Sequence, residues 1–260
     1  MNSDDLFRRL WPLYRTYHKN QHGFLSTAHT DNSRRPDEWP RGKHRTYARG
    51  ETVTPPNAFD PTAADPVLSA LHDRESFTDP TVSRPISKAE LFTILAAAYS
   101  VGSDAETRPV PSAGQKYPLE LYPLVVDATD IESGLYHYNP GRNVLERPAD
   151  PGYIADEYEP FESFIVDNWH HVEDEHAISV MILMTGIPTR ATQKYGELGY
   201  MFTLIEVGSV IQALQLAAGQ VDIGSRPYAG FQHTAVADLL ALVDHSREWV
   251  LLSIALAAPD

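Results

Sequence analysis

One long apolar segment, residues 200–219, constrains the fold of this chain more than any other feature. Its apolar side chains cover more than one face of a helix: Phe202, Ile205, Val207, Val210, Ile211, Leu214 and Leu216. A helix that is apolar nearly all round is normally buried. We therefore expect this helix either in the core of the subunit or in an interface between two subunits.

Shorter periodic segments surround this helix in the sequence. Helical patterns are predicted over residues 67–74, 91–99, 150–172 and 234–243. Strand patterns are predicted over residues 117–126, 134–141, 143–146, 176–184 and 249–257, the second and third forming a hairpin. Ser87 and Glu90 fit a capping box ahead of the helix at 91–99. The mixed order, without regular βαβ alternation, predicts an α+β fold.

The first 66 residues have a different character from the rest. Residues 1–20 show helical spacing of apolar side chains, whereas residues 21–66 are rich in Pro, Arg, Asp and Thr and have little periodicity. We predict an N-terminal helix and extended arm over residues 1–66, with disorder of the arm as the alternative. A single catalytic or binding domain is then predicted over residues 67–260.

Composition excludes several classes of function. A net charge of −14 disfavours a nucleic-acid partner, and the chain has no cysteine for disulfides, thiolate chemistry or iron–sulfur sites. We find no phosphate-binding loop, Rossmann fingerprint, hydrolase elbow or zinc-binding helix, and we expect no metal. The polar, acidic start of the chain and the lack of a long apolar run predict a cytoplasmic protein away from membranes. The acidity suits either a mesophilic or a halophilic source.

Residues 111–114, Pro-Ser-Ala-Gly, form a predicted turn directly before the strand that starts at Tyr117. Small residues let the backbone approach a flat ligand closely. The hydroxyl of Ser112 and the backbone N–H groups of Ala113 and Gly114 could bind polar ring atoms or a phosphate. An ordinary loop that enters a strand is the alternative, because Pro, Ser and Gly are common in loops.

Two further pairs of residues suggest chemistry. Arg74 and Ser76, at a helix end, can both reach one phosphate, although a surface arginine and a capping serine are the alternative. Lys194 and Tyr195 precede the long apolar helix, where a partly dry site would let either one exchange a proton near neutral pH. The alternative is a solvated lysine beside an anchoring tyrosine.

Three motifs together resemble one known family. They are Pro-Ser-Ala-Gly-x-x-Tyr-Pro-Leu-Glu-Leu-Tyr at 111–122, Gly-Leu-Tyr-His-Tyr-x-Pro at 134–140 and Lys-Tyr-Gly-Glu-x-Gly-Tyr at 194–200. The chain resembles the flavin-dependent nitroreductase superfamily, and within it the SagB/ThcOx branch of azoline oxidases. The resemblance implies an antiparallel-rich sheet flanked by helices. It also implies a homodimer with the long helix in the interface and FMN bound between the subunits.

The resemblance also implies roles for particular residues. FMN would contact Arg74 and Ser76 near its phosphate, the turn of Pro111, Ser112, Ala113 and Gly114 along the flavin, and Gly224, Pro227, Ala229 and Gly230 beside the ring edge. Lys194 and Tyr195 match the pair that peptide oxidases use for proton removal. The family often has a second basic residue where this chain has Thr78, and another after the last strand. Few basic side chains would therefore balance the charge of the FMN phosphate, unless Arg84, Arg190 or Arg226 contributes.

The function that follows is dehydrogenation of thiazoline or oxazoline rings in a ribosomally made peptide, with a cyclodehydratase and the precursor peptide as partners. An NAD(P)H-dependent nitro or quinone reductase is the alternative within enzymes. If the chain is not an enzyme, the alternative is a flavin-binding scaffold in a peptide-modifying complex. The sequence does not identify the substrate ring.

Overall fold

The computed structural model describes residues 66–77, 84–102, 107–148, 158, 160–170, 172, 178–242 and 247–259. The helix predicted over residues 1–20 and nearly all of the arm predicted up to residue 66 lie outside these ranges, and so does Thr78. All the candidate site residues named above lie within them.

A five-stranded sheet forms the centre of the described chain. Its strand order is β4 (Gly134–Leu135), β2 (Leu119–Val125), β7 (Val180–Gly186), β9 (Trp249–Ala257) and β8 (Gly224–Tyr228). Every neighbouring pair in this sheet is antiparallel. The sheet confirms the predicted α+β class with an antiparallel-rich centre.

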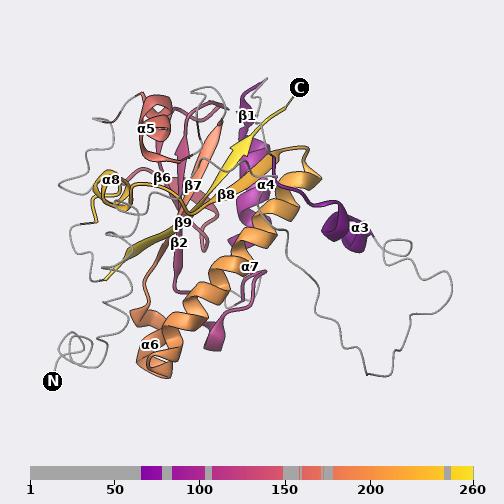
Figure 1. Ribbon diagram of the computed structural model, residues 1–260. Helices are drawn as coiled ribbons and strands as arrows, with labels where there is room; N and C mark the ends of the chain where they lie inside the picture. Colours follow the sequence, from indigo (N-terminus) through magenta and orange to yellow (C-terminus); the bar gives the residue numbers. More distant parts are fainter. Residues whose placement is uncertain are drawn as a thin grey trace, which may run out of the picture.

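Strand β7 lies in the middle of the sheet and is buried on both faces. Alternate side chains of a strand point to opposite faces, so Ile182 packs with helices α4 (Lys88–Tyr99) and α7 (Leu198–Gln220). Leu183 instead packs with α5 (Phe161–Asn168) and α8 (His233–Leu239). Two apolar cores therefore lie on the two sides of one sheet, which gives a three-layer arrangement (Figure 1).

Helix α7 runs diagonally across one face of the sheet and packs against α4, α6 (Thr189–Tyr195) and β8 (Figure 1). One side of α7 is in the core, but four large apolar side chains on it are exposed by 39% to 58%, namely Leu198, Met201, Leu204 and Ile205. The sequence allowed burial in the subunit or in an interface, and the single subunit buries only part of this helix. By length and composition alone, α7 would also be able to cross a membrane.

Short elements connect these layers. Helix α3 (Pro66–Asp73) precedes β1 (Ile86–Ser87), which pairs in parallel with β3 (Ala128–Thr129). Strands β5 (His137–Asn139) and β6 (Val144–Glu146) form a separate hairpin. The single strand predicted over residues 134–141 is therefore divided, because β4 pairs with β2 while β5 pairs with β6. The predicted capping box of α4 is present.

Candidate active site

The turn of small residues is a short 3-10 helix, η2 (Ala113–Gln115), that leads into β2. The backbone is left-handed at Gly114, where φ is +58° and glycine adopts it freely. It is also left-handed at Gln115 (φ +56°) and, just after η2, at Tyr117 (φ +42°), and there the side chains make it strained. A left-handed backbone costs a residue with a side chain about 1–2 kcal/mol. Such strain persists only where the surroundings fix it, and it is concentrated at functional sites.

Hydrogen bonds within the turn supply this constraint. The backbone N–H of Tyr117 donates to Ser112 Oγ at 2.8 Å, and that of Gln115 donates to the Ser112 carbonyl at 3.0 Å. The Tyr117 hydroxyl accepts from the backbone N–H of Arg108 at 3.0 Å. The Ser112 hydroxyl oxygen is thus used for a hydrogen bond within the turn. Pro111 and Gly114 are exposed, and Ala113 is half-buried.

Lys194 and Tyr195 lie at the C-terminal end of α6, on a short helix that the sequence did not predict. Lys194 is exposed and its Nζ lies 5.1 Å from the centre of the half-buried Tyr195 ring. That ring meets Phe202 of α7 edge-on, with 5.2 Å between ring centres. Helix α6 lies so close to α7 that a Cβ at Gly199 would be 2.6 Å from the Thr192 backbone.

The turn and the lysine–tyrosine pair are in contact. A Cβ added at Gly114 would lie 2.5 Å from the Tyr195 hydroxyl oxygen and 2.8 Å from Lys194 Nζ. Real Cβ atoms do not approach other atoms so closely. The absence of a side chain at Gly114 therefore makes room for both functional groups, which stand directly over the turn.

Arg74 and Ser76 belong to a second group of residues, just after α3. Ser76 Oγ accepts from Gln215 Nε2 at 3.0 Å, and the backbone N–H of Phe77 donates to the Ser225 carbonyl at 3.3 Å. Arg74 lines a pocket of about 700 Å³ between α3, the end of α7 and the start of β8. Gly224 lines the same pocket, so the structure brings Arg74, Ser76 and Gly224 together.

Few positive side chains are available in this pocket to balance the charge of a phosphate. Arg74 faces a lining that also includes the carboxylates of Asp73, Glu75 and Asp222. Two of the arginines considered as substitutes are paired elsewhere, because Arg84 Nη2 is 2.7 Å from Glu90 and Arg190 Nη2 is 2.6 Å from Glu120. The third, Arg226, has its guanidinium 5.2 Å from the Tyr228 ring centre. None of these three is among the described residues that line the pocket.

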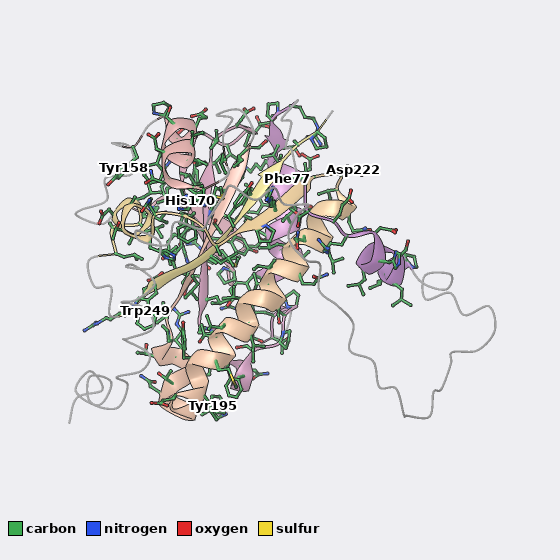
Figure 2. The ribbon with its side chains drawn as sticks, in the orientation of Figure 1. Phe77, Tyr158, His170, Tyr195, Asp222 and Trp249 are labelled. Carbon is green, nitrogen blue, oxygen red and sulfur yellow. The ribbon has the colours of Figure 1, made fainter. Side chains whose placement is uncertain are left out.

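The remaining candidate residues lie further along or just beyond β8. Pro227 pairs with Ile254 in the sheet, Ala229 is exposed, and the Gly230 carbonyl accepts from the His170 backbone N–H at 2.9 Å. His170 and Phe77 mark the two ends of this segment in Figure 2. These residues follow Gly224 along and just beyond β8, and they are not in contact with the Lys194–Tyr195 pair.

The two groups of candidate residues lie near opposite ends of α7, as Tyr195 and Phe77 show in Figure 2. Tyr195 contacts Phe202 and Ser76 contacts Gln215, which are thirteen residues apart. That interval corresponds to about 20 Å along a helix and about 140° around its axis. Within one subunit, the proposed phosphate residues and the proposed proton-transfer residues therefore do not form one site.

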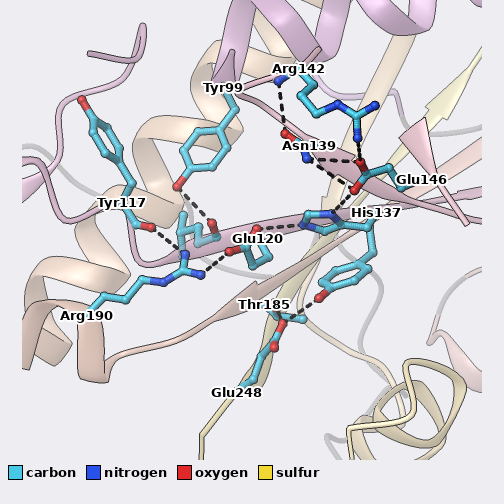
Figure 3. A network of polar contacts seen from close by, with 12 residues as sticks. Tyr99, Tyr117, Glu120, His137, Asn139, Arg142, Glu146, Thr185, Arg190 and Glu248 are labelled. Carbon is cyan, nitrogen blue, oxygen red and sulfur yellow. Dashed lines mark hydrogen bonds and ion pairs between the residues drawn. The ribbon is translucent and has the colours of Figure 1, made fainter. Parts of the chain in front are cut away.

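A polar network lies behind the turn and α6 (Figure 3). At its centre Glu120 of β2, 14% exposed, accepts from His137 Nε2 at 2.9 Å and from Arg190 Nη2 at 2.6 Å. Arg190 Nη1 also donates to the Tyr117 carbonyl at 3.1 Å. Burial alone would raise the pKa of Glu120, but the bonds and charges of His137 and Arg190 lower it below its ordinary value.

Glu206 of α7 is a second buried carboxyl beside the turn, 2% exposed. It accepts from the Tyr99 hydroxyl at 2.9 Å and is hydrogen-bonded to Ser112. Burial raises its pKa above the ordinary value, although these hydrogen bonds and the charge of Arg108 act in the other direction. The Arg108 guanidinium lies 4.2 Å from the Tyr99 ring centre, which completes the packing behind the turn.

Sequence reasoning missed the residues that support the site. Glu206 carried a usable signal, because it is the only charged residue in the apolar segment 200–219. Glu120 and Gln215 had no such signal, since their partners are distant in sequence. Arg190 was considered for phosphate binding, but the structure shows it paired with Glu120 and the Tyr117 carbonyl instead.

Comparisons with known proteins identify the family of this chain. Residues 82–257 match the nitroreductase family, so the chain belongs to the nitroreductase family of oxidoreductases. It is 29% identical over 165 residues to MJ1384 of Methanocaldococcus jannaschii, named as a candidate nitroreductase, covering 63% of this chain and 78% of that protein. It is 28% identical over 139 residues to the microcin B17-processing protein McbC of Escherichia coli, covering 52% of this chain and 48% of McbC.

Solved structures show the same fold. A chain in the E. coli microcin synthetase McbBCD complex with truncated pro-MccB17 matches with a TM-score of 0.60 and 21% identity, over 82% of this chain and 79% of that one. A nitroreductase-type structure from Anabaena variabilis matches with a TM-score of 0.61 and 21% identity, over 75% of this chain and 38% of that one. The likeness to McbC agrees with the branch that the sequence motifs indicate.

The residues present fit the flavin that the resemblance implies. A pocket of about 700 Å³ is large enough for a ligand of this size, and Arg74, which lines it, offers a guanidinium to a phosphate. Ser76 is not in the lining, but its hydroxyl is bonded to Gln215, which is. At the other end of α7, Gly114 presents an exposed backbone without a side chain. The single arginine among the described pocket residues is the weak point of this fit.

Proposed function

We propose that this chain is an FMN-dependent oxidoreductase that dehydrogenates azoline rings in a ribosomally made peptide. The observation that carries the proposal is the contact of Lys194 and Tyr195 with Gly114. This contact places two groups capable of proton transfer against the turn that, by resemblance, lies along the flavin. A reductase that takes hydride from a nicotinamide has no need of such a pair.

The chain's own residues have a defined part in this reaction. Aromatisation of an azoline removes a hydride and a proton from the ring, and FMN, when bound, supplies the hydride acceptor, with dioxygen as the final oxidant. Lys194 or Tyr195 takes the proton from the ring carbon. The strained turn fixes the position of Gly114, so that the ring and the proton acceptor are held in one geometry.

We further propose that the complete site forms in a homodimer. The phosphate residues and the proton-transfer residues lie near opposite ends of α7. The exposed apolar face of this helix, between Leu198 and Ile205, lies at the end that contacts the proton-transfer residues. A second copy covering that face would join the Arg74 group of one subunit to the Lys194 group of the other. An isologous two-fold interface makes two such sites at once.

The partners that we propose follow from the relative McbC. McbC is named as a processing protein for microcin B17, and the related structure holds McbBCD with truncated pro-MccB17. By analogy, a cyclodehydratase would supply the azoline and the substrate would be a peptide. The likeness to McbC covers about half of its length, so the peptide itself is not identified by it.

Substitution of Lys194 tests the proposed function. We expect Lys194→Ala to bind FMN but to oxidise a synthetic thiazoline-containing peptide about 100-fold more slowly, because the loss of a general base typically costs 10²–10⁴-fold. Lys88→Ala, which removes another exposed lysine, is the matched control and should keep full activity. Full activity of Lys194→Ala with FMN bound would show that Lys194 is not the proton acceptor.

A nitro or quinone reductase is the second candidate, favoured by the similarity to MJ1384. Stopped-flow mixing of the FMN-loaded protein with NADPH distinguishes the two. Rapid bleaching of the flavin absorbance supports the reductase, whereas indifference to NADPH together with peptide oxidation supports the azoline oxidase.

A further inference from the structure

Helix α6, which carries Lys194 and Tyr195, is too short to hold these side chains in place by itself. It has 7 residues, and isolated helices of this length are unstable in water. Gly199 packs against it from α7, but this contact is made by backbone atoms of Ala191 and Thr192, not by Lys194 or Tyr195. The Tyr195 ring also packs edge-on against Phe202 of α7. These contacts join α6 to α7, and a different contact joins α6 to the turn and the sheet.

Arg190 makes that contact. It lies one helical turn before Lys194 on α6, so its side chain leaves the helix on the same side. One nitrogen of its guanidinium is 2.6 Å from Glu120 Oε1, and another donates to the Tyr117 carbonyl at 3.1 Å. Tyr117 is itself one of the strained residues of the turn, with φ of +42°.

Glu120 is a fixed anchor for this arginine. It belongs to the central sheet, where it is paired with Thr185 of β7 in register, and its second oxygen accepts from His137. Both carboxylate oxygens therefore have partners, and the planar guanidinium of Arg190 bridges two different acceptors, which a lysine cannot do with the same geometry. The sheet, the strained turn and α6 are joined at this one side chain (Figure 3).

We propose that Arg190, held by Glu120, is a positioning residue that sets how Lys194 and Tyr195 meet the turn at Gly114. The proposal rests on the proposed function in one respect: the position of Lys194 and Tyr195 affects the reaction only if these residues transfer a proton. Arg190 itself contacts neither the pocket that Arg74 lines nor the exposed backbone of Gly114. Its effect should therefore fall on the chemical step and not on the binding of FMN.

Three variants test this role: Arg190→Ala, Arg190→Lys and the control Arg142→Ala. Arg142 is in the same polar network but at its exposed end, where it pairs with Glu146 at 2.8 Å and does not contact α6. For Arg190→Ala we expect kcat on the thiazoline peptide to fall on the order of 10- to 100-fold, because small misplacements of reacting groups cost this much. The KM and the dissociation constant of FMN should stay at wild-type values.

The two other variants separate positioning from general destabilisation. Arg190→Lys keeps the charge toward Glu120 but cannot also bond the Tyr117 carbonyl, so it should recover part of kcat. Arg142→Ala should behave like wild type. A rise in KM together with a fall in FMN affinity and in kcat, without recovery in Arg190→Lys, would show that Arg190 only stabilises the fold and would overturn the proposal.

A second readout does not depend on activity. The chain has lysines only at positions 19, 43, 88, 116 and 194, so acetylation by an N-hydroxysuccinimide ester can be followed at each residue by mass spectrometry. We expect Arg190→Ala to label Lys194 faster relative to Lys88, because Nζ leaves Tyr195 and the turn. Unchanged labelling of Lys194 would contradict the positioning role of Arg190, whether or not the wild type oxidises azolines. If the wild type oxidises no azoline but Lys194 is labelled faster in Arg190→Ala, the positioning role holds and the proposed function is wrong.

Discussion

Gly114 shows at the scale of one residue why the candidate site has its shape. Its backbone is left-handed, with φ of +58°, and the space that a Cβ would fill is occupied by the Tyr195 hydroxyl and Lys194 Nζ. Either condition alone would favour glycine. Together they tie the identity of this residue to the placement of the two groups that we assign to proton transfer.

Substitution of Gly114 by alanine should therefore damage both stability and activity. We expect Gly114→Ala to lose about 1–2 kcal/mol of unfolding free energy from the left-handed backbone and to lower kcat on the order of 10-fold or more as Lys194 and Tyr195 are displaced. Thermal unfolding and steady-state oxidation measure the two effects.

Gly141→Ala is the matched control for this prediction. Gly141 lies in the β5–β6 turn without a left-handed φ, and a Cβ there would meet only Asn139 Oδ1, at an ordinary 3.7 Å. If Gly141→Ala and Gly114→Ala have the same activity and stability, the close approach at Gly114 has no functional consequence.

At the scale of elements, α4 shows how a local signal fixes the start of a helix beside the sheet. The Ser87 hydroxyl accepts from the Glu90 backbone N–H at 3.2 Å, and a Glu90 carboxylate oxygen accepts from the Ser87 backbone N–H at 2.7 Å. The other Glu90 oxygen pairs with Arg84 at 2.7 Å. The hydrogen bond from Arg84 is the main cause that lowers the pKa of Glu90 to about 2.

The two halves of this cap should respond differently to pH. Ser87→Ala should cost about 1 kcal/mol of stability at neutral pH, as the loss of a helix cap typically does. The contribution of Glu90 is present above the ordinary carboxyl pKa and is lost as the pH falls toward about 2, because a lowered pKa in the folded state stabilises only the ionised form.

Denaturant unfolding from pH 6 down to pH 2.5 checks this difference. The stability gap between wild type and Glu90→Gln should shrink steadily as the pH is lowered. The gap to Ser87→Ala should change less, because the hydrogen bond of Ser87 lowers the pKa of Glu90 less than that of Arg84 does. A Glu90→Gln gap that does not change with pH would mean that the ion pair with Arg84 does not stabilise the helix.

At the scale of the whole molecule, the exposed apolar face of α7 is the feature that a single subunit leaves unexplained. We expect Ile205→Asp, at a side chain 58% exposed, to convert the proposed dimer to a monomer, because a charge cannot be buried unpaired in such an interface. If each site draws residues from two copies, the monomer should also lose bound FMN.

Light scattering after gel filtration, together with the ratio of flavin to protein absorbance, measures both outcomes. Thr234→Asp, on the exposed side of α8 across the sheet, is the control and should remain a dimer with full FMN. A monomeric Ile205→Asp that still binds one FMN per chain would rule out a site shared between subunits.

Several elements could be predicted from the sequence because their signals are local. The last strand was predicted over 249–257 and is observed as Trp249–Ala257, and the helix predicted over 67–74 is observed as Pro66–Asp73. The capping residues of α4 were also correct. Caps and apolar periodicity act over a few residues, so the sequence alone contains the information.

Other elements could not be predicted, because distant partners define them. Helix α6 contains β-branched threonines and has no clear apolar stripe, and the ion pair of Arg190 with Glu120 joins it to a strand 70 residues earlier in the chain. Strand β8 contains Gly, Arg and Pro and is a strand because β9 pairs with it.

The sequence by itself determined the α+β class, the apolar character of α7 on more than one face, and the candidate residues in the turn, after α3 and before α7. The tertiary structure alone decided which of these residues meet. In the folded chain Gly114 lies against Lys194 and Tyr195. Ser76 is hydrogen-bonded to Gln215, and Arg190 forms an ion pair with Glu120. The reason is physical: side-chain chemistry and periodicity are local, whereas contacts between residues far apart in the chain depend on how the helices pack on the sheet.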